Sequence, residues 1–298
     1  MDVTDNDEKR LAERFEAHRA HLRAVAYRML GSLSEANDAV QEGWLRLSRS
    51  DTSGVENLGG WLPVVIARVC LDMLRSRKAR HEDPLDAHAP KWMVNHQDGM
   101  DPEQEVLLAD SVGLALLVVL NTLAPAERLA FVLHDMFAVP FEQIASIVGR
   151  SPAAARQLAS RARRQVRGVA TIPDAELARQ REAVDAFLTA ARGGDFDALL
   201  AVLDPDVVVR ADRAAVPPGE SREIHGAQAV AEQALVFSRR ARFAQTALVN
   251  GAVGIIVAPR GRLLTVMIFT VKRGKIVEID VLADSARLRR LDLAVFDD

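Results

Sequence analysis

Cysteine is almost missing from the sequence, since Cys70 is the only one among 298 residues. A single cysteine excludes an intrachain disulfide, and it also excludes zinc sites of the cysteine-rich finger type. Such sparing use of cysteine is typical of a reducing compartment. We therefore expect a cytoplasmic protein that holds neither a metal nor another cofactor.

Long hydrophobic runs and an excess of one charge are missing too. The longest apolar run, near 112–120, is about half as long as a membrane helix requires. The first ten residues, MDVTDNDEKR, are acidic and polar, whereas a secretory signal is basic and then apolar. The 38 basic and 41 acidic side chains give a net charge of −3. We expect no membrane partner and no uniformly basic nucleic-acid coat, although local basic segments remain compatible with this balance.

The composition that is present is that of a folded protein with several domains. Apolar residues make up 49% of the chain, more than a disordered chain carries. Roughly 150 residues per domain would give about two domains, but the residue pattern divides the chain more finely. It predicts two all-α domains over about 10–80 and 102–168, with a linker over 81–101 between them. An α+β domain with a mostly antiparallel sheet is predicted over 172–298.

Individual residues predict where several elements begin and end. Ser34 is the expected N-cap of one helix, and the next helix is expected from Trp61, with Pro63 in its first turn. In the last third, Lys272-Arg273-Gly274-Lys275 lies between two β-rich runs and predicts a hairpin.

Residues 140–167 have the sequence form of a helix-turn-helix. An apolar pattern at helical spacing leads into Gly149-Arg150-Ser151, and a second helix follows at once. Six arginines and no acid lie between Arg150 and Arg167, whereas a solvated face normally mixes both signs. Because the arginine fork binds guanine edges and phosphates, we predict that this helix reads DNA. The side chains expected to contact DNA are Arg150, Ser151, Arg156, Gln157, Ser160, Arg161, Arg163, Arg164 and Arg167.

Two further motifs lie in the first helical block. The segment SEANDAVQEGWLRL, residues 34–47, places acidic and amide side chains beside a tryptophan and leucines on adjacent turns. The helix WLPVVIARVCLDMLRSRKAR that follows ends in a basic cluster, with five bases against one acid between Arg68 and Arg80. Together with the helix-turn-helix, these motifs resemble the extracytoplasmic-function sigma factors of bacterial RNA polymerase. The similarity covers about 15–167 and preserves the order of the family's parts.

The resemblance implies core RNA polymerase and promoter DNA as partners. In that family the helix similar to DAVQEGWLRL docks on the polymerase clamp. Asp38, Gln41 and Glu42 would then face basic clamp residues, with Leu45 or Trp44 as the apolar anchor.

The same resemblance assigns the −10 promoter element to the basic helix and the −35 element to the helix-turn-helix. Melted strands are held by basic grooves and by pockets for flipped bases. The residues expected at the −10 element are Asn57, in the polar loop 50–60, and Arg68, Arg75, Arg77 and Lys78.

Residues 172–298 look like the SnoaL branch of the NTF2-like α+β cone fold, which extends the actinobacterial sigma factors of the sigma-I and sigma-J type. Such relatives carry a Gly-rich loop, a WLPEP-like linker stretch and an NPDK-like tail. This chain instead has DRAAVPPGESREIHG, APKWMVNHQDGMDP and LADSARL. Residues 89–94 and 283–291 are still expected to hold the domain against the helical blocks.

The C-terminal domain is not expected to be an enzyme. Acid–base catalysis needs carboxylates or histidines that point into a cavity with shifted pKa values. The candidates, Asp212, His225, Asp280 and Asp284, form no tight motif. A cavity lined by apolar side chains, with a regulatory role, is the favoured interpretation.

Three functions follow as hypotheses. The leading one is an alternative sigma factor that binds core polymerase and directs promoter-specific initiation, with its C-terminal domain modulating activity. The second is a helix-turn-helix regulator with a domain that senses a small ligand, and it leaves DAVQEGWLRL unexplained. The third is an NTF2-like enzyme fused to a DNA-binding module. No sequence feature indicates a separate anti-sigma factor, and the long extension favours regulation within the chain.

Overall fold

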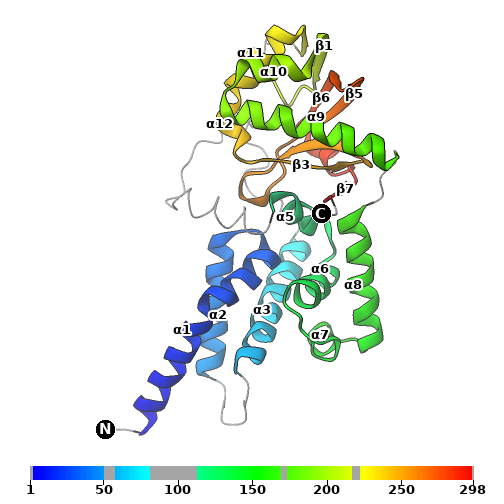
Figure 1. Ribbon diagram of the computed structural model, residues 1–298. Coiled ribbons are helices and arrows are strands. Elements are labelled where there is room, and N and C mark those ends of the chain that lie inside the picture. Colours follow the sequence, from blue (N-terminus) through cyan, green and yellow to red (C-terminus); the bar gives the residue numbers. More distant parts are fainter. Residues whose placement is uncertain (1–2, 50–57, 81–112, 169–172, 217–221, 297–298) are drawn as a thin grey trace. The chain divides into compact units, whose positions relative to one another are not determined.

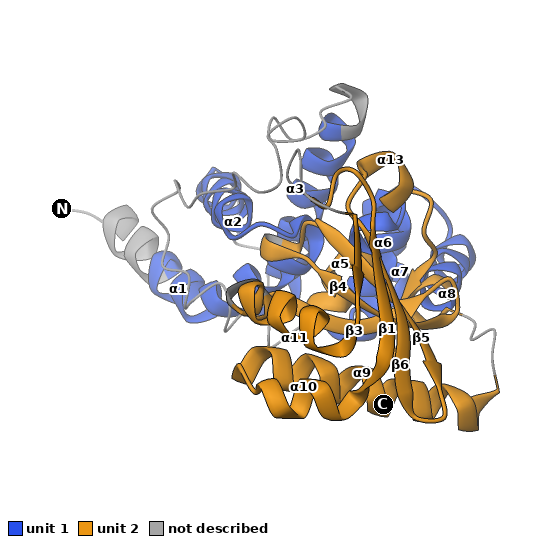
Figure 2. Ribbon diagram, turned by 90° about the horizontal axis from the view of Figure 1, so that it is seen from above, with its two compact units in different colours: residues 1–82, 120–164 blue, residues 83–119, 165–298 orange. Residues whose placement is uncertain are grey.

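The chain forms two compact units in a computed structural model that describes residues 3–49, 58–80, 113–168, 173–216 and 222–296 (Figure 1). The first unit contains 1–82 and 120–164, and the second contains 83–119 and 165–298 (Figure 2). The predicted linker 81–101 lies outside the described residues. No helix in the described ranges is long and apolar enough to cross a membrane.

The first unit consists of helices. Its elements are α1 (Val3–Leu30), α2 (Leu33–Ser48), α3 (Leu58–Arg80), α6 (Pro125–Phe131), the π-helix η3 (Val132–Met136), α7 (Phe141–Val148) and α8 (Pro152–Arg167). The last turn of α8 and most of α5 (Leu114–Thr122) belong to the second unit.

Helices α1, α2 and α3 pack around a core of large apolar side chains. Phe15, Leu22 and Tyr27 of α1 are buried together with Leu62 and Ile66 of α3. Gly43 of α2 allows close packing, because a Cβ atom at this position would overlap Ile66 Cδ1. The sequence pattern of apolar residues every three or four positions is thus the pattern that closes this core.

Two of the predicted helix boundaries are wrong. Ser32, not Ser34, is the N-cap of α2: its backbone is extended, and its Oγ accepts a hydrogen bond from the Glu35 N–H at 3.4 Å. Helix α3 begins at Leu58, so Pro63 lies inside the helix and beyond its first turn. Leu58 is buried, and it is the first residue described after 50–57.

The second unit contains a seven-stranded sheet in the order β2-β1-β6-β5-β4-β3-β7. Its strands are β1 (Leu203–Ala211), β2 (Glu223–His225), β3 (Ala244–Val249), β4 (Ala252–Val257), β5 (Thr265–Lys272), β6 (Lys275–Leu282) and β7 (Leu293–Ala294). Strand β1 is parallel to β6, and every other pairing is antiparallel. The predicted hairpin is confirmed: β5 and β6 are joined by Arg273 and Gly274, both with positive φ.

Helices cover one face of this sheet, as Figure 2 shows for α9, α10 and α11. The helices of the second unit are α9 (Asp174–Gly193), α10 (Phe196–Val202), α11 (Ala227–Val236), α12 (Ser238–Ala241), the 3-10 turn η4 (Pro259–Gly261) and α13 (Ser285–Leu288). Between helices and sheet lies an apolar core that includes Val184, Phe187, Phe269, Ile276 and Ile279. The predicted α+β class is therefore confirmed.

Two hydrogen bonds join the sheet region of the second unit to residues of α5 and α8. The Gln245 side chain of β3 accepts a hydrogen bond from the Ala115 N–H, in the first turn of α5, at 2.8 Å. The Val295 N–H, just after β7, donates to the Val166 carbonyl in the last turn of α8 at 2.9 Å. Strand β3 and the segment after β7 thus contact the beginning of α5 and the end of α8.

Candidate nucleic-acid interface

Helices α7 and α8 form the predicted helix-turn-helix. Gly149 ends α7 in the left-handed conformation (φ 70°), which favours glycine because it has no Cβ. Ser151 precedes the first residue of α8 and caps the helix, because its Oγ accepts a hydrogen bond from the Ala154 N–H at 3.2 Å. The apolar sides of both helices are buried, including Ile144 in α7 and Ala159 in α8.

The opposite side of α8 is exposed and basic. The exposed members of the predicted DNA-contacting set are Arg150, Ser151, Arg156, Gln157, Ser160, Arg161, Arg164 and Arg167. Arg163 is half-buried. The structure therefore brings the predicted reader residues to one accessible helix face.

Acidic side chains from preceding elements pair with this face, although the helix itself carries none. Arg156 lies 3.1 Å from Glu142 of α7, and the Arg163 Nε donates to Asp135 of η3 at 2.5 Å. Arg161 lies 3.9 Å from Glu127 of α6. Exposed ion pairs of this kind contribute little to stability. Arg150 and Arg164 form no ion pair among the described residues.

A buried arginine that sequence reasoning missed lies behind this face. Arg128 of α6 is 3% exposed. Its Nε and Nη2 donate to the Arg28 carbonyl near the end of α1, at 3.0 and 2.8 Å, and its Nη1 donates to Asn121 Oδ1 at 2.6 Å. Helix C-termini attract cations, so this guanidinium joins α6 to the end of α1.

Burial dominates the electrostatics around Arg128. It lowers the pKa of Arg128 to about 9, which leaves the group charged at neutral pH. Burial raises the pKa of the nearby Cys70 thiol to about 12. The only sequence signal for this site is an arginine within the apolar run LAPAERLAFVL.

The predicted polymerase-docking residues of α2 lie on its accessible side. Asp38, Gln41 and Leu45 are exposed, and Leu45 is 38% exposed. Glu42 is half-buried and pairs with Arg46 at 2.9 Å. Trp44 instead packs against the Phe15 ring, with 5.2 Å between the ring centres. Of the two suggested anchors, Leu45 is thus the one available to a partner.

The basic end of α3 is less uniform than its sequence. Arg68 and Arg75 are exposed, whereas Arg77 is half-buried and forms an ion pair with Glu35 of α2. Lys78 belongs to α3, but its side chain is not among those that the structure describes. Asn57 and most of its loop lie outside the described residues.

Of the carboxylates weighed for catalysis in the second unit, Asp212 and Asp284 bind backbone N–H groups, and Asp212 and Asp280 line one pocket. Asp284 caps α13 through the Arg287 N–H at 2.9 Å, and Asp212 accepts two backbone N–H groups from the segment after β6. His225 is exposed beside Glu223. No group of three metal-binding side chains occurs within the described ranges.

Family models match both helical parts of the chain. Residues 14–80 match sigma-70 region 2, and residues 113–166 match sigma-70 region 4. The chain is 37% identical over 273 residues to the "Probable ECF RNA polymerase sigma factor SigI" of Mycobacterium tuberculosis, covering 91% of this chain and 92% of the relative. It is 40% identical over 253 residues to the ECF RNA polymerase sigma factor SigJ of that organism, covering 82% and 80%.

A crystal structure of the Mycobacterium tuberculosis SigJ covers 93% of this chain and 98% of its own, with 32% identity and a TM-score of 0.44. The similarity in sequence reaches beyond the helical regions into the second unit, where helices cover one face of the seven-stranded sheet. The helix-turn-helix, the region 2 helices and the extended match agree: the chain belongs to the extracytoplasmic-function family of RNA polymerase sigma factors.

Proposed function

We propose that the chain binds core RNA polymerase through α2 and promoter DNA through α3 and α8. The exposed arginine face of α8, positioned by the Gly149 turn, is the observation that carries the proposal. Arg150, Arg156, Arg161 and Arg164 present guanidinium groups on one helix face, which suits a major groove and its phosphates.

The docking of polymerase on α2 rests on an apolar anchor with a polar rim. Leu45 is exposed although it is apolar, and Asp38 and Gln41 lie on neighbouring turns. Interfaces commonly combine such an anchor with a polar surround. Asp38, Gln41, Glu42 and Leu45 form the proposed contact.

Contact with the −10 element is assigned to the basic end of α3. Arg68 and Arg75 are accessible as they stand, whereas Arg77 must leave Glu35 before it can bind a phosphate. Asn57 and Lys78 complete this assignment on the family resemblance alone.

Holding both promoter elements at once requires α6–α8 to separate from α1–α3. The elements are centred about 25 base pairs apart, on the order of 80 Å at about 3.4 Å per pair. The bonds of Arg128 to the Arg28 carbonyl join the two sets of helices directly. We infer that this contact belongs to the free protein and opens on the promoter.

The C-terminal domain is proposed to modulate transcription from within the chain, as a non-catalytic part. Its support is a pair of hydrogen bonds, from the Ala115 N–H to the Gln245 side chain and from the Val295 N–H to the Val166 carbonyl, which lie at the beginning and the end of region 4. Gln245→Ala should alter promoter activity, whereas Gln228→Ala, on the exposed side of α11, should leave it unchanged.

The deciding experiment is run-off transcription from fragmented genomic DNA with purified full-length protein and core RNA polymerase. Discrete transcripts that require the protein are expected, and the double variant Arg150→Gln/Arg164→Gln should lose them. Arg179→Gln, an exposed arginine of α9, is the matched control and should retain them. Tight sequence-specific DNA binding by the protein alone, without any polymerase-dependent transcript, would favour the regulator hypothesis instead.

A further inference from the structure

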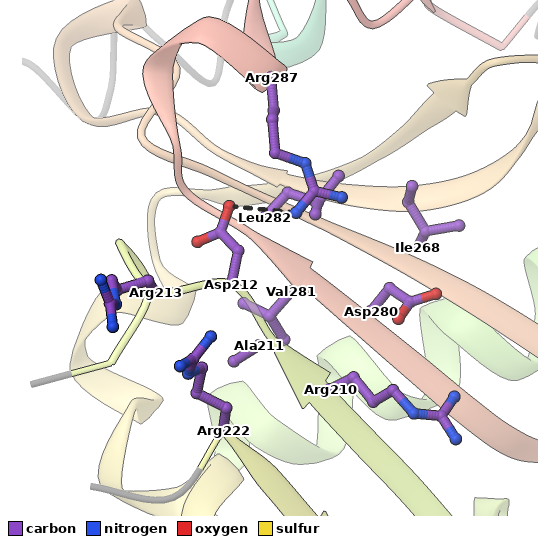
Figure 3. A pocket seen from close by; sticks show the side chains of 10 residues that line it. All are labelled: Arg210, Ala211, Asp212, Arg213, Arg222, Ile268, Asp280, Val281, Leu282 and Arg287. Carbon is purple, nitrogen blue, oxygen red and sulfur yellow. Dashed lines mark ion pairs between the residues drawn. The ribbon is translucent and has the colours of Figure 1, made fainter. Parts of the chain in front are cut away.

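The second unit contains a pocket lined by arginines at the carboxyl ends of the neighbouring strands β1 and β6 (Figure 3). Its volume is about 420 Å³, within the range of small-molecule sites. Asp280 lies in its lining and, by strand alternation, on the opposite sheet face from the core residue Ile279. Val281, on the other face, lines it too, so the pocket lies at the carboxyl ends of β1 and β6, and none of the buried core side chains between helices and sheet, such as Phe187 and Phe269, lines it.

We propose that this pocket binds a small phosphate ester. Four arginines line it, from three different places in the fold: Arg210 at the end of β1, Arg213 and Arg222 between β1 and β2, and Arg287 in α13. Two aspartates, Asp212 and Asp280, accompany them.

One of the two aspartates is committed to the protein itself. Asp212 Oδ2 accepts the N–H groups of Ala283 and Asp284 at 3.0 and 2.9 Å, and its Oδ1 accepts the Ala214 N–H at 3.1 Å. Its side chain is only 6% exposed. The Arg287 Nη1 lies 3.9 Å from it, too far for a hydrogen bond. Asp212 thus fixes the rim of the pocket and forms an ion pair with Arg287 there, drawn as the dashed line in Figure 3.

The four arginines of the lining differ in whether a carboxylate of the protein pairs with them. Arg210 is held by Glu223 and Glu278. Arg213 and Arg222 are exposed and form no ion pair with any described residue. They place around one hollow two guanidinium groups that have no carboxylate partner in the described ranges, and Arg287 adds a third that is shared with Asp212.

The chemistry of the lining selects the ligand. A guanidinium fork binds phosphate oxygens in pairs, and several forks together suit a doubly charged group. Asp280 can accept a hydrogen bond from a ligand hydroxyl, and Ile268 and Val281 offer an apolar wall. A hydroxylated phosphate ester, such as a sugar phosphate, meets all three surfaces, and a hollow suits it better than the continuous backbone of DNA.

Thermal unfolding of the full chain with ribose 5-phosphate tests the proposal, at constant ionic strength with sodium chloride as the reference. At 20 mM ligand we expect Tm to rise by at least about 2 °C, because ligand binding stabilises the folded state. Arg213→Gln/Arg222→Gln should abolish the shift. Arg289→Gln/Arg290→Gln, two exposed arginines outside the pocket, should keep it.

Three results would overturn the proposal. The first is an unchanged Tm of the wild-type protein with ribose 5-phosphate, and the second is an equal rise of Tm in both double variants. The third is a rise of Tm that depends on Arg213 and Arg222 with a short DNA duplex but not with ribose 5-phosphate. Both substituted arginines are exposed, so the Tm of the ligand-free variants should stay near that of the wild type and verify that they fold. Because no polymerase is present, this result is independent of the proposed initiation function.

Discussion

Region 4 uses arginine in two environments, and the contrast shows what burial does to a single residue type. Arg128 is almost wholly buried and uses three guanidinium nitrogens within the protein. Exposed arginines of α8, such as Arg156 and Arg161, are matched by single carboxylates of neighbouring elements, and Arg163 is half-buried. The first is expected to hold helices together, because a buried charge without its partners is costly. The second set is expected to exchange its weak pairs for phosphate at little cost.

The largest expected effect is the protection of Cys70, which lies near Arg128 and is fully buried. Burial keeps the thiol protonated and inaccessible, so iodoacetamide at pH 8 should modify the native protein at least about a thousandfold more slowly than the unfolded chain. Mass spectrometry of timed samples measures this rate directly, since Cys70 is the only cysteine. Modification at the unfolded rate would mean that the helical unit is open, and the contrast drawn above would fail.

Arg128→Met should lower the free energy of unfolding by about 2–3 kcal/mol. The Arg28 carbonyl and Asn121 lose hydrogen bonds to a charged donor, although relief from burying the charge offsets part of the loss. Urea unfolding followed by circular dichroism measures the change. Arg161→Met, on the exposed face of α8, is the matched substitution and should cost less than about 0.5 kcal/mol. Equal losses in the two variants would remove the distinction between buried and exposed arginine.

The adjacent residues Leu45 and Trp44 of α2 allow a second comparison between an exposed side chain and a packed one. Leu45→Ala should weaken binding to core polymerase about tenfold while leaving stability within about 0.5 kcal/mol, because an exposed anchor contributes to binding instead of folding. Trp44→Ala should mainly destabilise the protein, because its ring packs on Phe15. Fluorescence anisotropy with labelled protein gives the affinity. The docking assignment is wrong if Leu45→Ala binds polymerase as the wild type does.

The smallest effect concerns one exposed arginine of α8. Arg164→Gln should reduce promoter affinity only a few-fold and lower the slope of log affinity against log salt by about 1, as expected for one lost phosphate contact. Titrations of the polymerase-bound protein with promoter duplex at several salt concentrations measure the slope. Arg179→Gln should leave the slope unchanged, and a change there would point to a nonspecific charge effect.

Local signals in the sequence were sufficient for much of the fold. Gly149 predicted the turn because left-handed backbone favours glycine, and Pro125 and Pro152 lie at the first positions of α6 and α8. The hairpin at Arg273 and Gly274 could be predicted for the same local reason. The prediction of Ser34 as the N-cap of α2 is two residues late, because serine suits a cap at either position and the extended backbone that makes Ser32 the cap is not visible in the sequence.

The candidate site was predictable only as a pattern of charge. The helical periodicity of α8 placed its arginines on the side opposite its apolar residues, because a helix fixes that geometry. The acids that pair with Arg156 and Arg163 come from α7 and η3, and no periodicity within α8 could indicate them. Arg128 is similar: its partners lie 7 and 100 positions away, and only tertiary packing brings them together.

The bond between Val295 and Val166 has a consequence for biosynthesis. A ribosome makes protein from the N-terminus onward, so the last turn of α8 leaves it long before β7 and Val295 exist. Region 4 can form its helices early, and Ala115 can bond to Gln245 once β3 exists, but the attachment of the last turn of α8 must wait for the segment after β7. A nascent chain arrested after β6 would therefore carry a complete helix-turn-helix whose last turn is not yet bonded to the sheet.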